Sequence, residues 1–116
     1  MEASILISVK KVLGIAPEYT AFDEDILMHI NTALSTLTQL GIGPAAGYTV
    51  DGTDDDWDDL FGATEHPLNA IKSYIFLRVR MLFDPPQTSY LIDAMTRQVN
   101  ELEWRLNIHR ETTMEG

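Results

Sequence analysis

Apolar residues recur three or four positions apart in successive stretches of the chain, and glycine and proline residues separate these stretches. This spacing predicts an all-α fold, a small helical bundle of four to five helices with one long loop. The length of 116 residues fits a single domain, predicted to span residues 1–108 and to be followed by a flexible C-terminal tail over 109–116. The predicted elements are helices over about 4–13, 23–40, 54–61, 67–83 and 89–108, with the loop over 41–53.

The stretch from Leu68 to Pro86 is the part around which the other predicted helices are arranged. Asp84 and the two prolines that follow it end this helix, because the residue before a proline is pushed out of the α region. A helix with apolar residues on two sides needs neighbours on both, so it is either the centre of the bundle or buries one side against another subunit. One stripe consists of Leu68, Ile71, Ile75, Val79 and Leu82, and the second of Ala70, Tyr74, Leu77 and Met81.

Helix ends are marked by residues that commonly cap helices. Asp23 is expected to cap the second helix, and Gly14 and Gly41 are expected to end the first and second helices. Lys10 and Lys11 are expected to face away from the apolar side of the first helix.

The last predicted helix carries one narrow apolar stripe, which is typical of a helix that lies on a single partner helix. Trp104 falls outside this stripe and needs a second contact. The stripe consists of Ile92, Met95, Val99, Leu102 and Leu106.

The net charge of −10 is concentrated in the first part of the chain. Residues 1–65 hold twelve acidic residues against two lysines, whereas residues 66–116 hold six acidic and six basic residues. A protein that binds nucleic acid through its phosphates needs a basic patch, so this distribution argues against specific DNA binding.

The absence of cysteine excludes a disulfide framework and every cysteine-based metal or nucleophile site. The apolar runs are far shorter than a membrane span, and the N-terminus lacks the features of a signal peptide. We therefore expect a soluble protein with no targeting signal and no membrane partner.

An acidic run follows the predicted loop and invites comparison with an EF-hand calcium loop. Asp54, Asp56, Asp58 and Glu65 occupy ligand positions of that loop, but Asp59 stands where the sharp turn requires glycine. The favoured interpretation is a solvated acidic surface at the start of a helix, made of Asp54, Asp55, Asp56, Asp58 and Asp59.

No pattern in the sequence indicates an active site. The three histidines are too scattered for a metal cluster, and no phosphate loop, dinucleotide fingerprint or nucleophile elbow is present. We therefore predict no catalytic residue, no metal site and no cofactor.

Arg78 falls between the two apolar stripes of the Leu68–Pro86 helix. Two interpretations of this position are equally good. The side chain either extends along the bundle to reach solvent, or pairs with a carboxylate from the first half of the chain or from the next subunit.

Five segments carry a resemblance to a known family. The chain resembles the head–tail connector (adaptor) proteins of long-tailed bacteriophages and prophages, also labelled DNA-packaging proteins, from about Ile5 to Ile108 and least over 51–64. The segments are ILISVKKVLGI, FDEDILMHINTAL, TQLGIGP, IKSYIFLRVRMLFDPP and ELEWRLNI.

The resemblance implies a small helical subunit without enzymatic activity that assembles into a ring, dodecameric in the family, beneath the portal protein. Such a ring extends the channel for double-stranded DNA and gives a tail-side stopper or tail protein a docking surface. It implies a virion component at the head–tail interface, assembled in the host cytoplasm. Because the C-terminal segment of family members tends to engage the portal, Ile108, His109 and Arg110 are candidate portal contacts.

A ring in which every subunit has identical neighbours on both sides agrees with a helix that has two apolar sides. The acidic run would then line the channel, where like charge keeps DNA from adhering, or remain a solvated surface. Two other classes stay open: an acidic interaction protein, such as a DNA mimic or inhibitor acting as monomer or dimer, and a metal-dependent enzyme or calcium switch. The candidate subunit-interface residues are Ala70, Tyr74, Leu77, Arg78, Met81 and Trp104.

Overall fold

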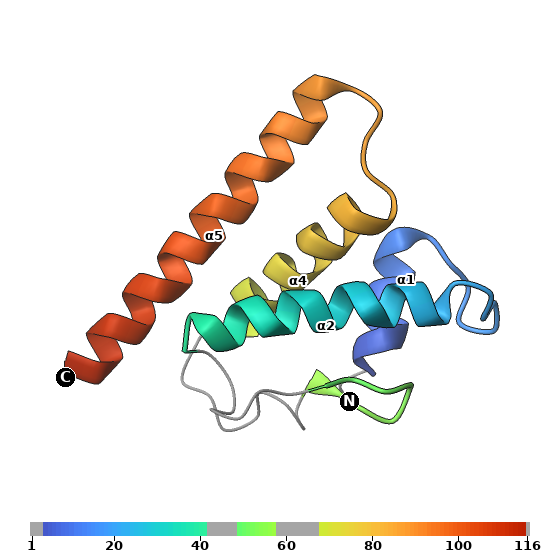
Figure 1. Cartoon of the computed structure of the whole chain (residues 1–116), viewed down its shortest axis with the longest axis horizontal. Coiled ribbons are helices and arrows are strands. Elements are labelled where there is room, and N and C mark those ends of the chain that lie inside the picture. The colour runs from blue at the N-terminus through green and yellow to red at the C-terminus, as the bar shows by residue number, and fades with distance from the viewer. Residues whose placement is uncertain (1–3, 42–48, 58–67, 116) are drawn as a thin grey trace.

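The computed structural model describes residues 4–41, 49–57 and 68–115, with side chains described as far as Leu106. This part of the chain forms four helices, which pack into a small all-helical bundle as the hydrophobic spacing predicts (Figure 1). The described residues form no β-strand and contain one isolated antiparallel bridge, between Ser4 and Asp56. The helices are α1 (Ile5–Leu13), α2 (Asp23–Gln39), α4 (Leu68–Phe83) and α5 (Ser89–Glu115).

Three of the predicted elements extend beyond the described residues. They are the loop at residues 42–48, the helix predicted over 54–61 at residues 58–61, and the helix predicted over 67–83 at residue 67. Residues 54–56 are described and are not helical, because Asp56 forms the bridge to Ser4.

The ends of α1 follow from local chemistry. The Ser4 hydroxyl accepts a hydrogen bond of 3.0 Å from the backbone N–H of Ile7 and so caps the first turn. At the other end, Gly14 takes the left-handed conformation (φ 80°) that glycine adopts without steric cost, and Gly41 does the same after α2 (φ 83°). Both glycine endings confirm the prediction.

The start of α2 differs from the prediction. Phe22 occupies the cap position and makes no side-chain cap hydrogen bond, while Asp23 is the first helical residue. The prediction that Asp23 caps α2 is therefore wrong. Its carboxylate is used elsewhere, in an ion pair with Lys10 of α1.

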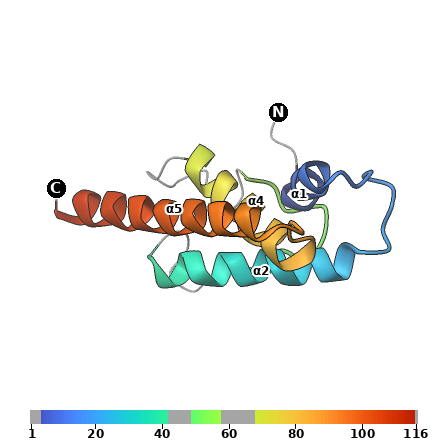
Figure 2. The ribbon, with the colours of Figure 1, turned by 90° about the horizontal axis from the view of Figure 1, so that it is seen from above.

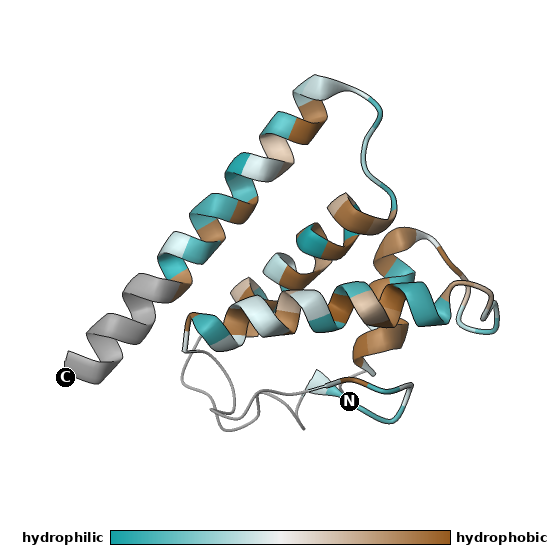
Figure 3. Cartoon of the chain, viewed as in Figure 1, coloured by the Kyte–Doolittle hydropathy of each residue, from teal (hydrophilic) through white to brown (hydrophobic). Residues whose placement is uncertain are grey.

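Helix α4 is the centre of the bundle, because it contacts α1, α2 and α5. Ile71, Ile75 and Val79 of the first predicted stripe are fully buried, whereas Leu82 in the last turn remains 46% exposed. Figure 3 shows the apolar positions concentrated on α1, α4 and the facing side of α2. These helices and the segment 49–57 supply the rest of the core, which includes Ile5, Leu6, Val9, Ile26, Ile30, Ala33, Leu34, Leu37, Val50 and Trp57.

The segment 49–57 is attached to α1 and α2 through polar contacts. Asn31 of α2 accepts a hydrogen bond from the Val50 backbone N–H at 2.8 Å and donates one to the Val50 carbonyl at 3.1 Å. The Trp57 indole is buried and donates to the Ser8 hydroxyl at 3.1 Å. The segment is therefore held in place at both of its ends.

Helix α5 runs back along α4 and packs chiefly on that one helix, as its narrow stripe predicts. It continues to Glu115, so residues 109–115 are helical and the predicted end of this helix at 108 is wrong. The reason is that no glycine or proline interrupts the chain between Ser89 and Glu115. The flexibility of residues 109–116 stays a prediction. Figure 2 shows the C-terminal part of α5 projecting past α2 and α4.

Candidate subunit interface

An open groove runs between α4 and α5. Its larger part encloses about 520 Å³ and an adjoining part about 430 Å³. The two parts share Ser73, Leu102 and Arg105, so they form one continuous depression along the helix pair. Apolar side chains of Phe76, Leu77, Leu102 and Ala70 are interspersed there with polar side chains of Asn69, Ser73, Gln98, Glu101 and Arg105.

The candidate interface residues differ in their surroundings. Ala70 and Leu77 line the groove, and Met81 is half-buried against the core. Trp104 is 64% exposed on α5. Tyr74 is fully buried inside the subunit, so its side chain does not offer a surface to another subunit.

Tyr74 instead joins α4 to α5. Its hydroxyl donates a hydrogen bond of 2.7 Å to Glu103 Oε2. Burial raises the pKa of the Tyr74 hydroxyl well above its usual range, and the hydrogen bond and negative charge of Glu103 raise it further, while Arg78 acts in the opposite direction. The neutral phenol is therefore the form that fits this site.

Arg78 lies beside this pair and has no acidic partner among the residues that the structure describes. Its guanidinium carbon is 6.0 Å from the centre of the Tyr74 ring, which is a cation–π distance. The buried Nε atom has no hydrogen-bond partner, and no carboxylate of the described residues pairs with Arg78. Pairing with an acid of the first half of the chain is thus not observed among those residues, and pairing with the next subunit stays a prediction.

The described residues of the acidic run belong to segment 49–57, and some of them help to hold this segment in place. Asp54 is exposed, whereas Asp55 and Asp56 are half-buried. The Asp55 carbonyl accepts a hydrogen bond of 2.9 Å from Ile5 N–H, and its carboxylate accepts one of 3.1 Å from Asp51 N–H. Asp58 and Asp59 lie outside the described residues.

Metal-ligating side chains do not gather in the parts of the chain that the structure describes, where no group of three or more could hold an ion. Ile108, His109 and Arg110, the candidate portal contacts, belong to the last turns of α5, where side chains are not described.

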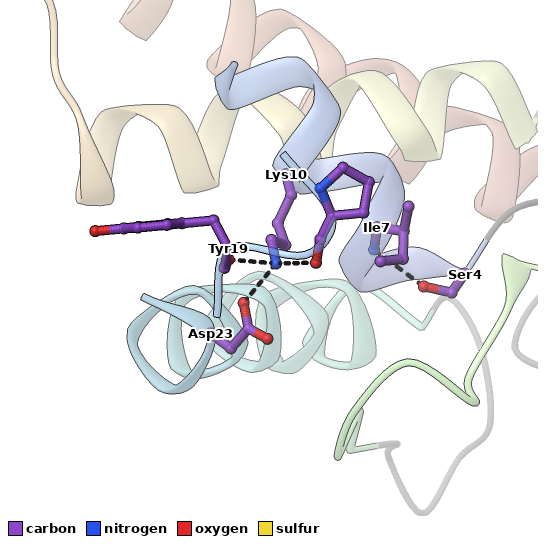
Figure 4. Close-up of polar contacts among 6 residues, drawn as sticks. Ser4, Ile7, Lys10, Tyr19 and Asp23 are labelled. Carbon is purple, nitrogen blue, oxygen red and sulfur yellow. Dashed lines mark hydrogen bonds and ion pairs between the residues drawn. The ribbon is translucent and has the colours of Figure 1, made fainter. Parts of the chain in front are cut away.

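Sequence reasoning missed a buried lysine. Lys10 is 1% exposed, so the prediction that it faces away from the apolar side of α1 is wrong. Its ammonium group is held by Asp23 at 2.8 Å and by the carbonyls of Pro17 and Tyr19 at 2.9 and 2.7 Å. Figure 4 shows Lys10 between Tyr19 and Asp23. These contacts fix the turn between α1 and α2. Lys10 comes four positions after the core residue Leu6 and therefore lies on the same side of α1. This spacing is the sequence signal that could have predicted its burial.

A row of aromatic side chains near the start of α2 was also missed. Phe22 packs against Tyr19 at 5.8 Å and against Phe83 at 5.4 Å between ring centres, and His29 approaches Phe83 at 6.4 Å. Tyr19 and Phe22 are about half exposed. This row connects the α1–α2 turn to the end of α4.

Comparison with known proteins places the chain in a family. Within the described residues, no helix is both long enough and apolar enough to cross a bilayer. No curated protein and no solved structure matches the chain. Residues 5–113, nearly the whole length, match the family described as phage connector protein, and the chain therefore belongs to that family.

Proposed function

We propose that the protein forms a ring beneath the portal of a phage capsid, joins the capsid to the tail and extends the DNA channel. The observation that carries this proposal is the family match over residues 5–113, which makes the chain a structural connector of phage heads and tails and implies assembly with portal and tail proteins. The ring, its dodecameric order and its place around the channel are the proposed part.

Two features of the subunit support assembly. Helix α5 packs chiefly on α4 and leaves Tyr90, Leu91 and Trp104 exposed, and an open groove lies beside it. A ring of identical subunits needs two different complementary surfaces on each copy, and an uncovered helix next to a groove offers both.

The acidic first half of the chain supports a channel through which DNA passes without adhering. Twelve acidic residues against two lysines in residues 1–65 give a repulsive surface toward phosphates. We propose that Asp54 and its acidic neighbours face this channel. A structure of the assembled ring with Asp54 on the outer rim would overturn this part of the proposal.

The C-terminal turns of α5 are the proposed portal contact. They project away from α2 and α4 and include Ile108, His109 and Arg110. The proposed assembly takes place in the host cytoplasm and ends in the virion, with neither an enzymatic reaction nor a cofactor.

Negative-stain imaging and native mass spectrometry, with and without the portal protein of the same phage, test the ring. Rings of this protein alone, or rings bound to the portal, are the expected result. Monomers or dimers that do not bind the portal protein would overturn the proposal and favour an acidic interaction protein.

A further inference from the structure

We propose that Trp104 of each subunit inserts into the α4–α5 groove of the next copy of the chain. This inference rests on the proposed ring, and it identifies which two surfaces of neighbouring subunits meet.

Trp104 lies on the side of α5 that faces away from α4. It stands five positions after Val99 and two before Leu106, the buried residues of α5, which places it on the opposite side of the helix. Arg97 and Tyr90 precede it at intervals of seven residues and are exposed along the same side. Tryptophan, tyrosine and arginine dominate the energetic centres of protein interfaces, so this side of α5 has the composition of a binding surface.

The groove has the shape and chemistry to receive an indole ring. Its larger part, of about 520 Å³, is lined by the apolar side chains of Phe76, Leu77 and Leu102. Gln98 and Glu101 also line it and carry oxygen atoms that can accept the indole N–H. Arg105, held by Glu101 at 2.6 Å, supplies a cation that can stack on the ring.

Charge favours a second copy of the chain as the occupant. Residues 68–106 carry five basic and four acidic residues, so two copies meet through α4 and α5 without strong repulsion. A strongly basic partner would instead be drawn to residues 1–65, which hold the whole excess of acid. The outer side of α5 and the groove are different surfaces, so their pairing is head-to-tail and can close into a ring.

Cross-linking tests this contact, because the chain has no cysteine of its own. Ser73→Cys places a thiol in the groove, and Asn100→Cys places one on exposed α5, one turn before an intact Trp104. The two variants, one carrying a size tag, are mixed and treated with a short bis-maleimide. The control mixture pairs Ser73→Cys with Lys11→Cys, an exposed position on α1.

The expected result is a mixed dimer of the groove and α5 variants well above the control. Adding Trp104→Ala to the Asn100→Cys chain should weaken the association more than about tenfold and reduce the mixed dimer to the control yield. Because Trp104 is exposed, the thermal unfolding of Trp104→Ala should match that of the wild type.

Three cross-linking outcomes overturn the proposal. They are a mixed dimer that survives Trp104→Ala, an Asn100→Cys variant that cross-links to itself as efficiently as to the groove variant, and a mixed dimer no stronger than the control. If the Trp104→Ala protein forms rings as the wild type does, this contact is rejected and the proposed ring is retained. Absence of wild-type rings with the portal would reject the ring itself.

Discussion

The hydroxyl of Tyr74 donates a hydrogen bond of 2.7 Å to the carboxylate of Glu103 and so ties α4 to α5. Among the side chains of α5 that the structure describes, as far as Leu106, only Val99 and Leu106 are buried. A charge-assisted hydrogen bond beside so small an apolar contact contributes a large share of what keeps α5 in place.

Tyr74→Phe removes the donor and leaves Glu103 facing a buried ring. We expect the free energy of unfolding to fall by about 1–2 kcal/mol, measured by urea denaturation. Tyr90→Phe is the matched control, because Tyr90 is 74% exposed and its hydroxyl makes no hydrogen bond among the described residues. Equal stability of the two variants would contradict this role of Tyr74.

Alkaline pH should destabilise the protein through the same residue. The pKa of Tyr74 is raised in the folded state by burial and by Glu103, so folding favours the neutral phenol. Its contribution to stability is complete below the unfolded pKa of about 10 and is lost as the pH rises above that value. In a titration followed by ultraviolet absorbance and circular dichroism, the ionisation of Tyr74 should coincide with unfolding. Ionisation of Tyr74 at the normal tyrosine pKa, with the helical spectrum intact, would contradict the prediction.

Lys10→Met tests the buried ion pair of the α1–α2 turn. The change removes the donor shared by Asp23 and the carbonyls of Pro17 and Tyr19, and should lower stability by on the order of 3 kcal/mol in a thermal or urea unfolding measurement. The matched control is Lys11→Met, whose exposed side chain should change stability by less than about 0.5 kcal/mol. If both variants lose the same stability, the pair contributes nothing specific.

Two substitutions on α4 separate folding from assembly. Ile75→Asp places an unpaired charge in the fully buried core and should unfold the monomer, as seen by circular dichroism. Leu77→Asp changes a half-buried residue of the groove and should leave the helical spectrum intact while abolishing rings in electron micrographs. An unfolded Leu77→Asp protein would show that this side of α4 belongs to the core and that the interface assignment is wrong.

The features that the sequence predicts well are local ones. The period of Ile71, Ile75 and Val79 depends only on helical geometry, and the glycine endings at Gly14 and Gly41 depend only on backbone conformation. For the same reason, the narrow stripe of α5 correctly indicates a single partner helix.

The features that the sequence does not predict depend on distant residues. The burial of Lys10 requires the chain to return at Pro17, Tyr19 and Asp23, and Tyr74 finds its acceptor 29 positions away. In the candidate interface, the pattern identifies Ala70 and Leu77 as a second apolar side. It cannot reveal the groove, because a groove exists only once α5 has been placed beside α4.

The one-sided packing of α5 divides the subunit into parts of unequal stability. Helices α1 and α2 contact each other as well as α4, whereas α5 contacts chiefly α4 and is joined to it by the connection that contains Pro85 and Pro86. Separation of α5 therefore exposes little of the buried core and costs less than global unfolding. The backbone amides of α5 should exchange with deuterated solvent as a group before those of α2 and α4, and binding of a second molecule along α5 would slow that exchange.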